Sequence, residues 1–208
     1  MQFFKSPLIT SPTLITAWTQ LTEPKPYVPK GGTPEPGDKG KYSVKLRLNP
    51  GEEEHDAFIR TLTAAAAKLE DEIMAAEGKR KLRKVEEFLP LGPELDENGE
   101  ETGVLLFRTS KKAGGISKRT GKAWESKLAK ITVTKERFAE AEGKNLGKGT
   151  RMRAAVTLRA YQTSGKWGIS ADLECAMIVE PQYFSGSVGA SAFDNVDIPE
   201  EDFEASAN

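Results

Sequence analysis

Residues 150–179 read TRMRAAVTLRAYQTSGKWGISADLECAMIV and contain the two clearest predicted strands of the chain. Apolar and polar side chains alternate with a period of two over 150–162 and again over 166–179, which is typical of half-buried strands. The residues between them, Thr163-Ser164-Gly165, are few enough for a hairpin loop. The polar face of the first strand carries three arginines and a tyrosine: Arg151, Arg153, Arg159 and Tyr161.

A third strand with the same period is predicted over 41–48, with Lys45 and Arg47 on its polar face. Acidic residues at 52–56 and an apolar stripe with spacings of three and four predict a long helix that follows it. Further strands are predicted over 12–21, 104–109 and 128–134, and a short helix over 135–143. About six strands and one long helix, without strand–helix alternation, predict a mainly β fold: a small antiparallel barrel with a long helix.

The composition is that of a soluble protein with one core. The chain has 208 residues, of which 38% are hydrophobic and 29% charged. Cys175 is the only cysteine, so no internal disulfide forms, and a reducing compartment is expected. We find no apolar run near the ~20 residues of a membrane helix and no signal peptide, so we expect an intracellular protein without membrane contact.

The formal net charge of -1 hides a strong segregation of charge. Between residues 108 and 166 there are sixteen Lys or Arg but only four Asp or Glu. The last fifteen residues contain six acids and no cation: Asp194, Asp197, Glu200, Glu201, Asp202 and Glu204. A basic surface attracts polyanions, and an acidic tail can compete for that surface within the molecule.

Aromatic residues are interleaved with these cations, a combination that suits an unpaired nucleic acid strand. Arginine contacts phosphates through two hydrogen bonds, and exposed bases stack on aromatic rings. Trp124, in a glycine-rich cationic segment, is the foremost stacking candidate, whereas the apolar neighbours of Trp167 on its strand face also favour a core position. The predicted DNA-binding residues are Lys45, Arg47, Arg108, Lys111, Lys112, Lys118, Arg119, Lys122, Trp124, Arg151, Arg153, Arg159, Tyr161, Lys166 and Trp167.

The residues that catalysis or a metal site requires are scarce. His55 is the only histidine and lies at the acidic start of the predicted helix, where solvent exposure is expected. One histidine and one cysteine do not complete a four-ligand zinc site without several carboxylates. No phosphate-binding GxxxxGK motif is present, and the few acids of the basic region do not suggest a two-metal nuclease. We therefore expect no enzyme activity, no cofactor and no metal.

Four stretches of the chain resemble the single-stranded DNA-binding proteins of tailed bacteriophages, the T7-like replication type. They are Ser11-Pro12-Thr13-Leu14, Gly40-Lys41-Tyr42-Ser43-Val44-Lys45-Leu46, the pair Gly149–Val156 and Gly165–Ala171, and Asp197-Ile198-Pro199-Glu200-Glu201-Asp202-Phe203. The resemblance implies an oligonucleotide-binding (OB-fold-like) barrel over 1–181 and a flexible acidic C-terminal tail over 182–208.

The same resemblance implies a role for the chain and for its tail. The role is phage DNA replication, recombination or repair in the cytoplasm of an infected bacterial host. The tail is implied to recruit replication proteins such as the polymerase and helicase-primase, and a homodimer is possible. The tail residues to which this role is assigned are Asp194, Asp197, Glu200, Glu201, Asp202 and Phe203.

Two other readings of the basic surface stay open at this stage. One is a phage interaction module whose basic face meets an acidic protein, and the other is a preference for RNA or duplex DNA. Barrels of this architecture serve many ligands, so the fold alone does not choose between them. Failure to bind oligo-dT identifies the interaction module, and a competition series against single-stranded DNA exposes a preference for RNA or duplex DNA.

Overall fold

The structure, a computed structural model, describes residues 4–26, 33, 37–77, 89–117, 120–142, 144–163 and 166–184. It contains one helix in this part of the chain, α1 (Glu53–Glu77). The strands are β1 (Ile9–Thr10), β2 (Leu14–Lys25), β3 (Lys41–Leu48), β4 (Leu91–Leu95), β5 (Glu101–Lys112), β6 (Gly114–Ile116), β7 (Ala123–Glu125), β8 (Ala129–Ile131), β9 (Asn145–Leu146), β10 (Arg151–Thr163), β11 (Lys166–Glu180) and β12 (Tyr183–Phe184).

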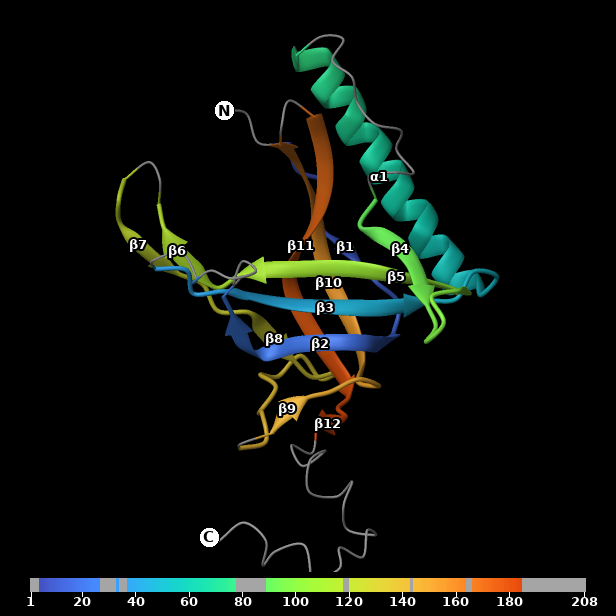
Figure 1. The fold of residues 1–208 in the computed structure, drawn as a ribbon, viewed down its shortest axis with the longest axis vertical. Helices are drawn as coiled ribbons and strands as arrows, with labels where there is room; N and C mark the ends of the chain where they lie inside the picture. Colours follow the sequence, from blue (N-terminus) through green and yellow to red (C-terminus); the bar gives the residue numbers. More distant parts are fainter. Residues whose placement is uncertain are drawn as a thin grey trace, which may run out of the picture.

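Five strands close into a ring. The main sheet runs β1-β10-β2-β3-β5-β11-β8, and β10 also pairs with β11, so that β10, β2, β3, β5 and β11 form a closed barrel (Figure 1). The mainly β barrel with one long helix is confirmed. The sheet is mixed, however, because β11 runs parallel to β5 and β8 while its other pairing is antiparallel.

The predicted hairpin of residues 150–179 is the β10–β11 pair. It runs from Arg151 opposite Glu180 to Thr163 opposite Lys166, with two register shifts. The apolar face of β10 is buried as expected, and it comprises Met152, Ala154, Val156, Leu158 and Ala160. β3 likewise has the predicted bounds and buries Tyr42, Val44, Leu46 and Leu48.

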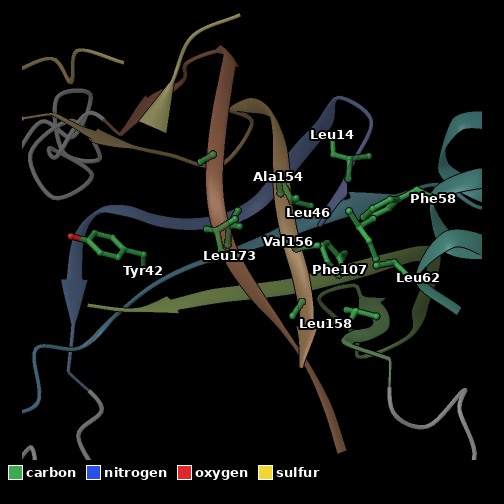
Figure 2. Close-up of a cluster of buried hydrophobic side chains, with 14 of the residues drawn as sticks. Leu14, Tyr42, Leu46, Phe58, Leu62, Phe107, Ala154, Val156, Leu158 and Leu173 are labelled. Atoms are coloured by element: carbon green, nitrogen blue, oxygen red, sulfur yellow. The ribbon is translucent and has the colours of Figure 1, made fainter. Parts of the chain in front are cut away.

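α1 packs against the barrel through its apolar stripe. The rings of Phe58 and Phe107 meet edge to face at 5.3 Å between centroids, with Leu62 beside them (Figure 2). Each fully buried side chain of this size contributes roughly 1.5–3 kcal/mol to folding. Glu53, Glu54 and Asp56 occupy the first turn, where the helix dipole favours negative charge. α1 thus covers one part of the barrel and leaves the polar face of β3 open.

The prediction of a short helix over 135–143 is wrong within its described residues. Thr132 N donates to Glu136 O and Phe138 N donates to Lys130 O, so the chain returns antiparallel to itself after β8. Lys135, with a positive φ of 65°, makes the turn. Between β5 and β8, the strands β6 and β7 pair as an antiparallel hairpin, which projects to the left in Figure 1.

The predicted acidic tail, 182–208, lies outside the described residues except for its first three. The division into a domain over 1–181 and a tail therefore stays a prediction. No helix in the described ranges has the length and apolar character needed to cross a membrane.

Candidate nucleic-acid interface

The outward faces of β2, β3 and β5 place an indole and two cations in one row. Trp18 of β2 pairs with Lys45 of β3, and Lys45 pairs with Arg108 of β5. Directly opposed residues of antiparallel strands point to the same side of the sheet. Trp18 is 43% exposed, although it is a large apolar residue, and Arg108 is exposed as well. The register of the three strands thus places the positive charges of Lys45 and Arg108 in one row with the indole ring of Trp18.

A groove follows this row over β3 and β5. It is lined by Trp18, Lys41, Ser43, Val44, Lys45, Arg108, Thr109 and Ser110. No carboxylate lines the groove, and within the described residues none of its three cations forms an ion pair. The charge of the groove is therefore available to a ligand.

A second hollow continues the groove and shares Lys41 and Ser110 with it. Its lining adds Lys5, Lys111, Lys112, Trp124, Ser126, Arg159, Asp172, Leu173 and Glu174. Lys112 and Trp124 both lie beside Gly115, where a Cβ would be 3.7 Å from Lys112 Nζ and 3.8 Å from Trp124 Nε1. We name the surface of both hollows together the cationic trough. Its rings are Trp18 and Trp124, and its cations without an ion pair among the described residues are Lys41, Lys45, Arg108 and Lys112.

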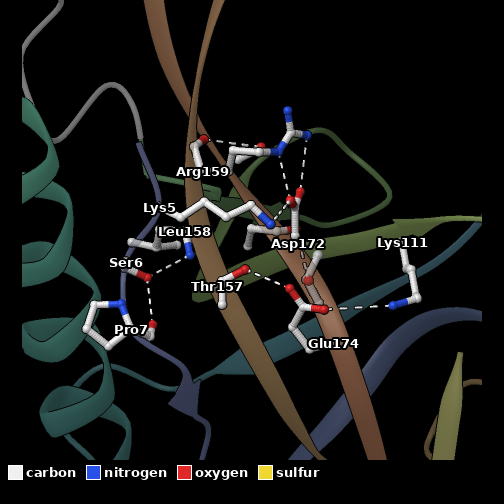
Figure 3. A network of polar contacts seen from close by, with 12 residues as sticks. Lys5, Ser6, Pro7, Lys111, Thr157, Leu158, Arg159, Asp172 and Glu174 are labelled. Atoms are coloured by element: carbon white, nitrogen blue, oxygen red, sulfur yellow. Dashed lines mark hydrogen bonds and ion pairs between the residues drawn. The ribbon is translucent and has the colours of Figure 1, made fainter. Parts of the chain in front are cut away.

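One wall of the trough contains internal ion pairs (Figure 3). Arg159 and Lys5 converge on the carboxylate of Asp172, with Arg159 Nε 2.7 Å from Asp172 Oδ2. Lys111 Nζ lies 3.7 Å from Glu174, which also accepts a hydrogen bond from the Thr157 hydroxyl at 2.9 Å. These three cations are partly neutralised, unlike those of the groove.

The trough therefore gathers six of the predicted DNA-binding residues: Lys45, Arg108, Lys111, Lys112, Trp124 and Arg159. Lys122 is exposed and immediately precedes β7, which carries Trp124. Lys118, Arg119 and the side chain of Lys166 lie outside the described part of the structure.

Three other predicted arginines lie apart from the trough and have internal partners. Arg47 donates from Nε and Nη2 to Glu94 at 2.9 and 2.6 Å. Arg151 lies 3.4 Å from Glu180 across the hairpin. Arg153 donates to the carbonyl of Ser11 at 3.1 Å and lines a hollow beside α1.

The three arginines on the polar face of β10 thus each have a partner within the protein. Alternation within a strand identifies the face on which a residue lies but not its neighbours on other strands. Here acids of β11 lie beside Arg151 and Arg159, and an acid of β4 lies beside Arg47.

The two predicted rings of the β10–β11 hairpin have different environments. Trp167 is 8% exposed and meets Phe4 edge to face at 6.0 Å, so it occupies the core position that its apolar neighbours favour, and its contact with DNA stays a prediction. Tyr161 is 41% exposed and packs over Gly168, where a Cβ would lie 2.6 Å from its ring. Only a glycine at 168 leaves room for this ring.

The sequence reasoning missed three residues of the trough: Lys5, Trp18 and Lys41. The position of Lys41 could have been predicted from the sequence, since it lies on the same predicted strand face as Lys45. The position of Trp18 could not be predicted in this way, because a register shift between Thr16 and Trp18 breaks the alternation of β2. Lys5 is placed at the trough by its isolated bridge to Arg159, a residue far away in the sequence.

Beneath the trough, Tyr42 belongs to the core. Burial raises the pKa of its hydroxyl, and the carboxylates of Glu140 and Glu125 raise it further. The ring is therefore a neutral phenol at physiological pH, with Lys130 Nζ 5.9 Å from its centroid. Among the described residues, no group of three or more His, Cys, Asp or Glu side chains gathers as a metal site.

Comparison with known proteins gives a consistent picture at the level of fold. No protein-family model matches the sequence, and neither does any curated protein. Solved structures do match. One is gp2.5, a single-stranded DNA-binding protein encoded by bacteriophage T7, with a TM-score of 0.56 and 17% identity, covering 94% of this chain and 97% of that one.

The single-stranded DNA-binding protein of bacteriophage Enc34, in complex with ssDNA, matches with a TM-score of 0.55 and 13% identity. The match covers 84% of this chain and 87% of the Enc34 chain. The same protein without its C-terminus matches with a TM-score of 0.54 and 12% identity over 85% and 88% of the two chains. This chain has the fold of phage single-stranded DNA-binding proteins. The resemblance first noted from four sequence stretches is confirmed at that level.

Proposed function

We propose that the chain binds single-stranded DNA along the cationic trough, without a strong sequence preference. The observation that carries the proposal is the row Trp18, Lys45 and Arg108, which crosses three strands on an open face. Phosphates would contact the cations, and bases would stack on the indoles of Trp18 and Trp124. A duplex keeps its bases stacked inside, so it gains nothing from these rings.

The chemistry of the trough supports sequence-tolerant binding. Every base has a flat face, and stacking on an aromatic side chain contributes ~1–3 kcal/mol per base irrespective of its identity. Each neutralised phosphate of a single strand contributes a slope of about -0.7 to the dependence of log affinity on log salt. Lys41, Lys45, Arg108 and Lys112 have no carboxylate partner within the described residues, so their charge can act on phosphate.

The solved structures support the same function, since the T7 and Enc34 proteins are named as single-stranded DNA-binding proteins and one of them was solved with ssDNA. The proposal extends to a non-enzymatic role in phage DNA replication, recombination or repair inside the infected host cell. In that role the acidic tail, including Asp202 and Phe203, would recruit replication partners, and the chain would form dimers.

A gel-shift titration tests the binding proposal. Wild-type protein is titrated into oligo-dT, duplex DNA and RNA of equal length. We expect tighter binding to oligo-dT than to the duplex. Trp18→Ala should weaken oligo-dT binding about 5- to 150-fold, which corresponds to the loss of one stacked base.

Arg108→Ala should weaken oligo-dT binding and flatten its salt dependence, whereas Arg151→Ala, which removes an arginine outside the trough, should change neither. Equal effects of the two arginine changes would indicate that DNA does not bind specifically along the trough. Absence of any oligo-dT shift would favour the acidic-protein partner instead, and stronger retention of RNA or duplex would contradict the preference for single-stranded DNA.

A further inference from the structure

Trp18 lines another hollow besides the trough, between β2 and residues 145–148. This hollow, of about 370 Å³, has a size typical of small-ligand sites. It is lined by Ala17, Trp18, Thr19, Gln20, Leu21, Thr22, Glu23, Lys25, Asn145, Leu146, Gly147 and Lys148. We name it the β2–β9 hollow. Because Trp18 borders both surfaces, a ligand on its ring can extend into either one.

Hydrogen bonds at both ends of the β2–β9 hollow hold it open. At one end Thr16 Oγ1 donates to Gly147 O at 3.1 Å, and Gly149 N donates to Thr16 O at 2.9 Å. At the other end Leu146 N donates to Thr22 Oγ1 at 3.4 Å. Between these contacts, the described residues form no hydrogen bond that closes 17–21 onto 145–148. The hollow is therefore bounded by hydrogen bonds on both sides and is open between them.

The lining groups suit a nucleotide. Lys25 and Lys148 are exposed, and within the described residues neither forms an ion pair, while Glu23 is the only acid of the lining. Thr19 contributes a buried hydroxyl that has no hydrogen-bond partner among the residues that the structure describes. A buried polar group without a partner is rare in folded proteins, and a ligand or a water molecule at such a site supplies the missing bond.

We propose that the β2–β9 hollow is a second nucleotide subsite, in which the single strand continues past the base stacked on Trp18. The proposal rests on the function proposed above. Lys148 would contact a phosphate in this subsite, and the following base would enter between β2 and residues 145–148. The trough and the hollow would then form one path that bends at Trp18.

Oligonucleotides of different length distinguish binding in the trough from binding in the β2–β9 hollow. OB folds occupy about 4–16 nucleotides, so affinities are measured with oligo-dT at both ends of that range. The short oligonucleotide fits within the trough, and the long one also reaches the β2–β9 hollow. Lys148→Gln should weaken the long complex about fivefold at 0.1 M salt, as expected for one lost phosphate contact, and should leave the short complex unchanged.

Lys144→Gln is the matched control, because Lys144 is an exposed lysine of the same segment that does not line the hollow. It should leave both complexes unchanged. An unchanged long complex in Lys148→Gln, or an equal loss in Lys144→Gln, would overturn the second subsite. Failure of the wild-type protein to bind either oligonucleotide would instead overturn the proposed function, so the two failures are distinguishable.

Discussion

Arg159 donates to both carboxylate oxygens of Asp172, from Nε at 2.7 Å and from Nη2 at 3.2 Å, across the β10–β11 hairpin. Lys5 lies 3.7 Å from the same carboxylate. Two cations that face the trough are therefore held by one acid of the neighbouring strand. A DNA phosphate that contacts either cation has to compete with Asp172.

Asp172→Asn should tighten binding to oligo-dT. The amide keeps the shape of the side chain but removes the charge that competes with phosphate for Arg159 and Lys5. The salt dependence should steepen by up to about 1.4 in log–log slope, the value for two additional phosphate contacts. Titrations at several salt concentrations measure both effects.

The control for this change is Glu180→Gln, which frees Arg151 at a position outside the trough and should leave the slope unaltered. Weaker binding by Asp172→Asn would contradict the competition between Asp172 and phosphate, and would mean that Asp172 orients Arg159 for DNA.

Fluorescence should distinguish the three tryptophans. Addition of oligo-dT should quench Trp18 and Trp124, which are 43% and 39% exposed on the trough, because bases stack on their rings. Trp167, buried against Phe4, should keep its emission. Variants that retain a single tryptophan, with phenylalanine at the other two positions, measure each signal separately. Quenching of Trp167 alone would be inconsistent with DNA binding along the trough.

Gly114→Ala should disturb the β6–β7 hairpin and weaken DNA binding. A Cβ at Gly114 would lie 2.5 Å from the backbone oxygen of Trp124, so the paired strand has to move. Overpacking of this kind costs roughly 1–3 kcal/mol. Gly115→Ala is the matched control, since its nearest contact would be an ordinary 3.7 Å. Thermal unfolding and oligo-dT titration of both variants test the difference, and equal behaviour would show that the hairpin does not position Trp124.

The thiol of Cys175 should react slowly with alkylating reagents. Burial raises its pKa, and this outweighs the opposing effects of the Ala176 backbone and the Lys111 charge. The reactive thiolate is therefore scarcer at pH 8 than in a free cysteine. The pH dependence of iodoacetamide alkylation should show a midpoint above that of a cysteine-containing peptide. A midpoint at or below the peptide value would contradict the raised pKa.

Local patterns of the sequence were sufficient for the main elements of the fold. Alternation with a period of two identified β3 and both strands of the β10–β11 hairpin, together with their buried faces. Helical spacing and an acidic first turn identified α1. The excess of cations between residues 108 and 166 pointed to a polyanion as the ligand. Each of these signals depends on residues close together in the chain.

The position of the candidate interface depended on contacts between distant residues. The row Trp18, Lys45 and Arg108 exists only because β3 pairs with β2 on one side and β5 on the other. Pairing with Asp172 likewise ties Arg159 to an internal acid. Periodicity assigns a side chain to a face of its own strand, whereas strand register and barrel closure decide which side chains meet. For this reason the sequence determined the elements and the charge of the candidate interface, and only the tertiary structure decided where that interface lies.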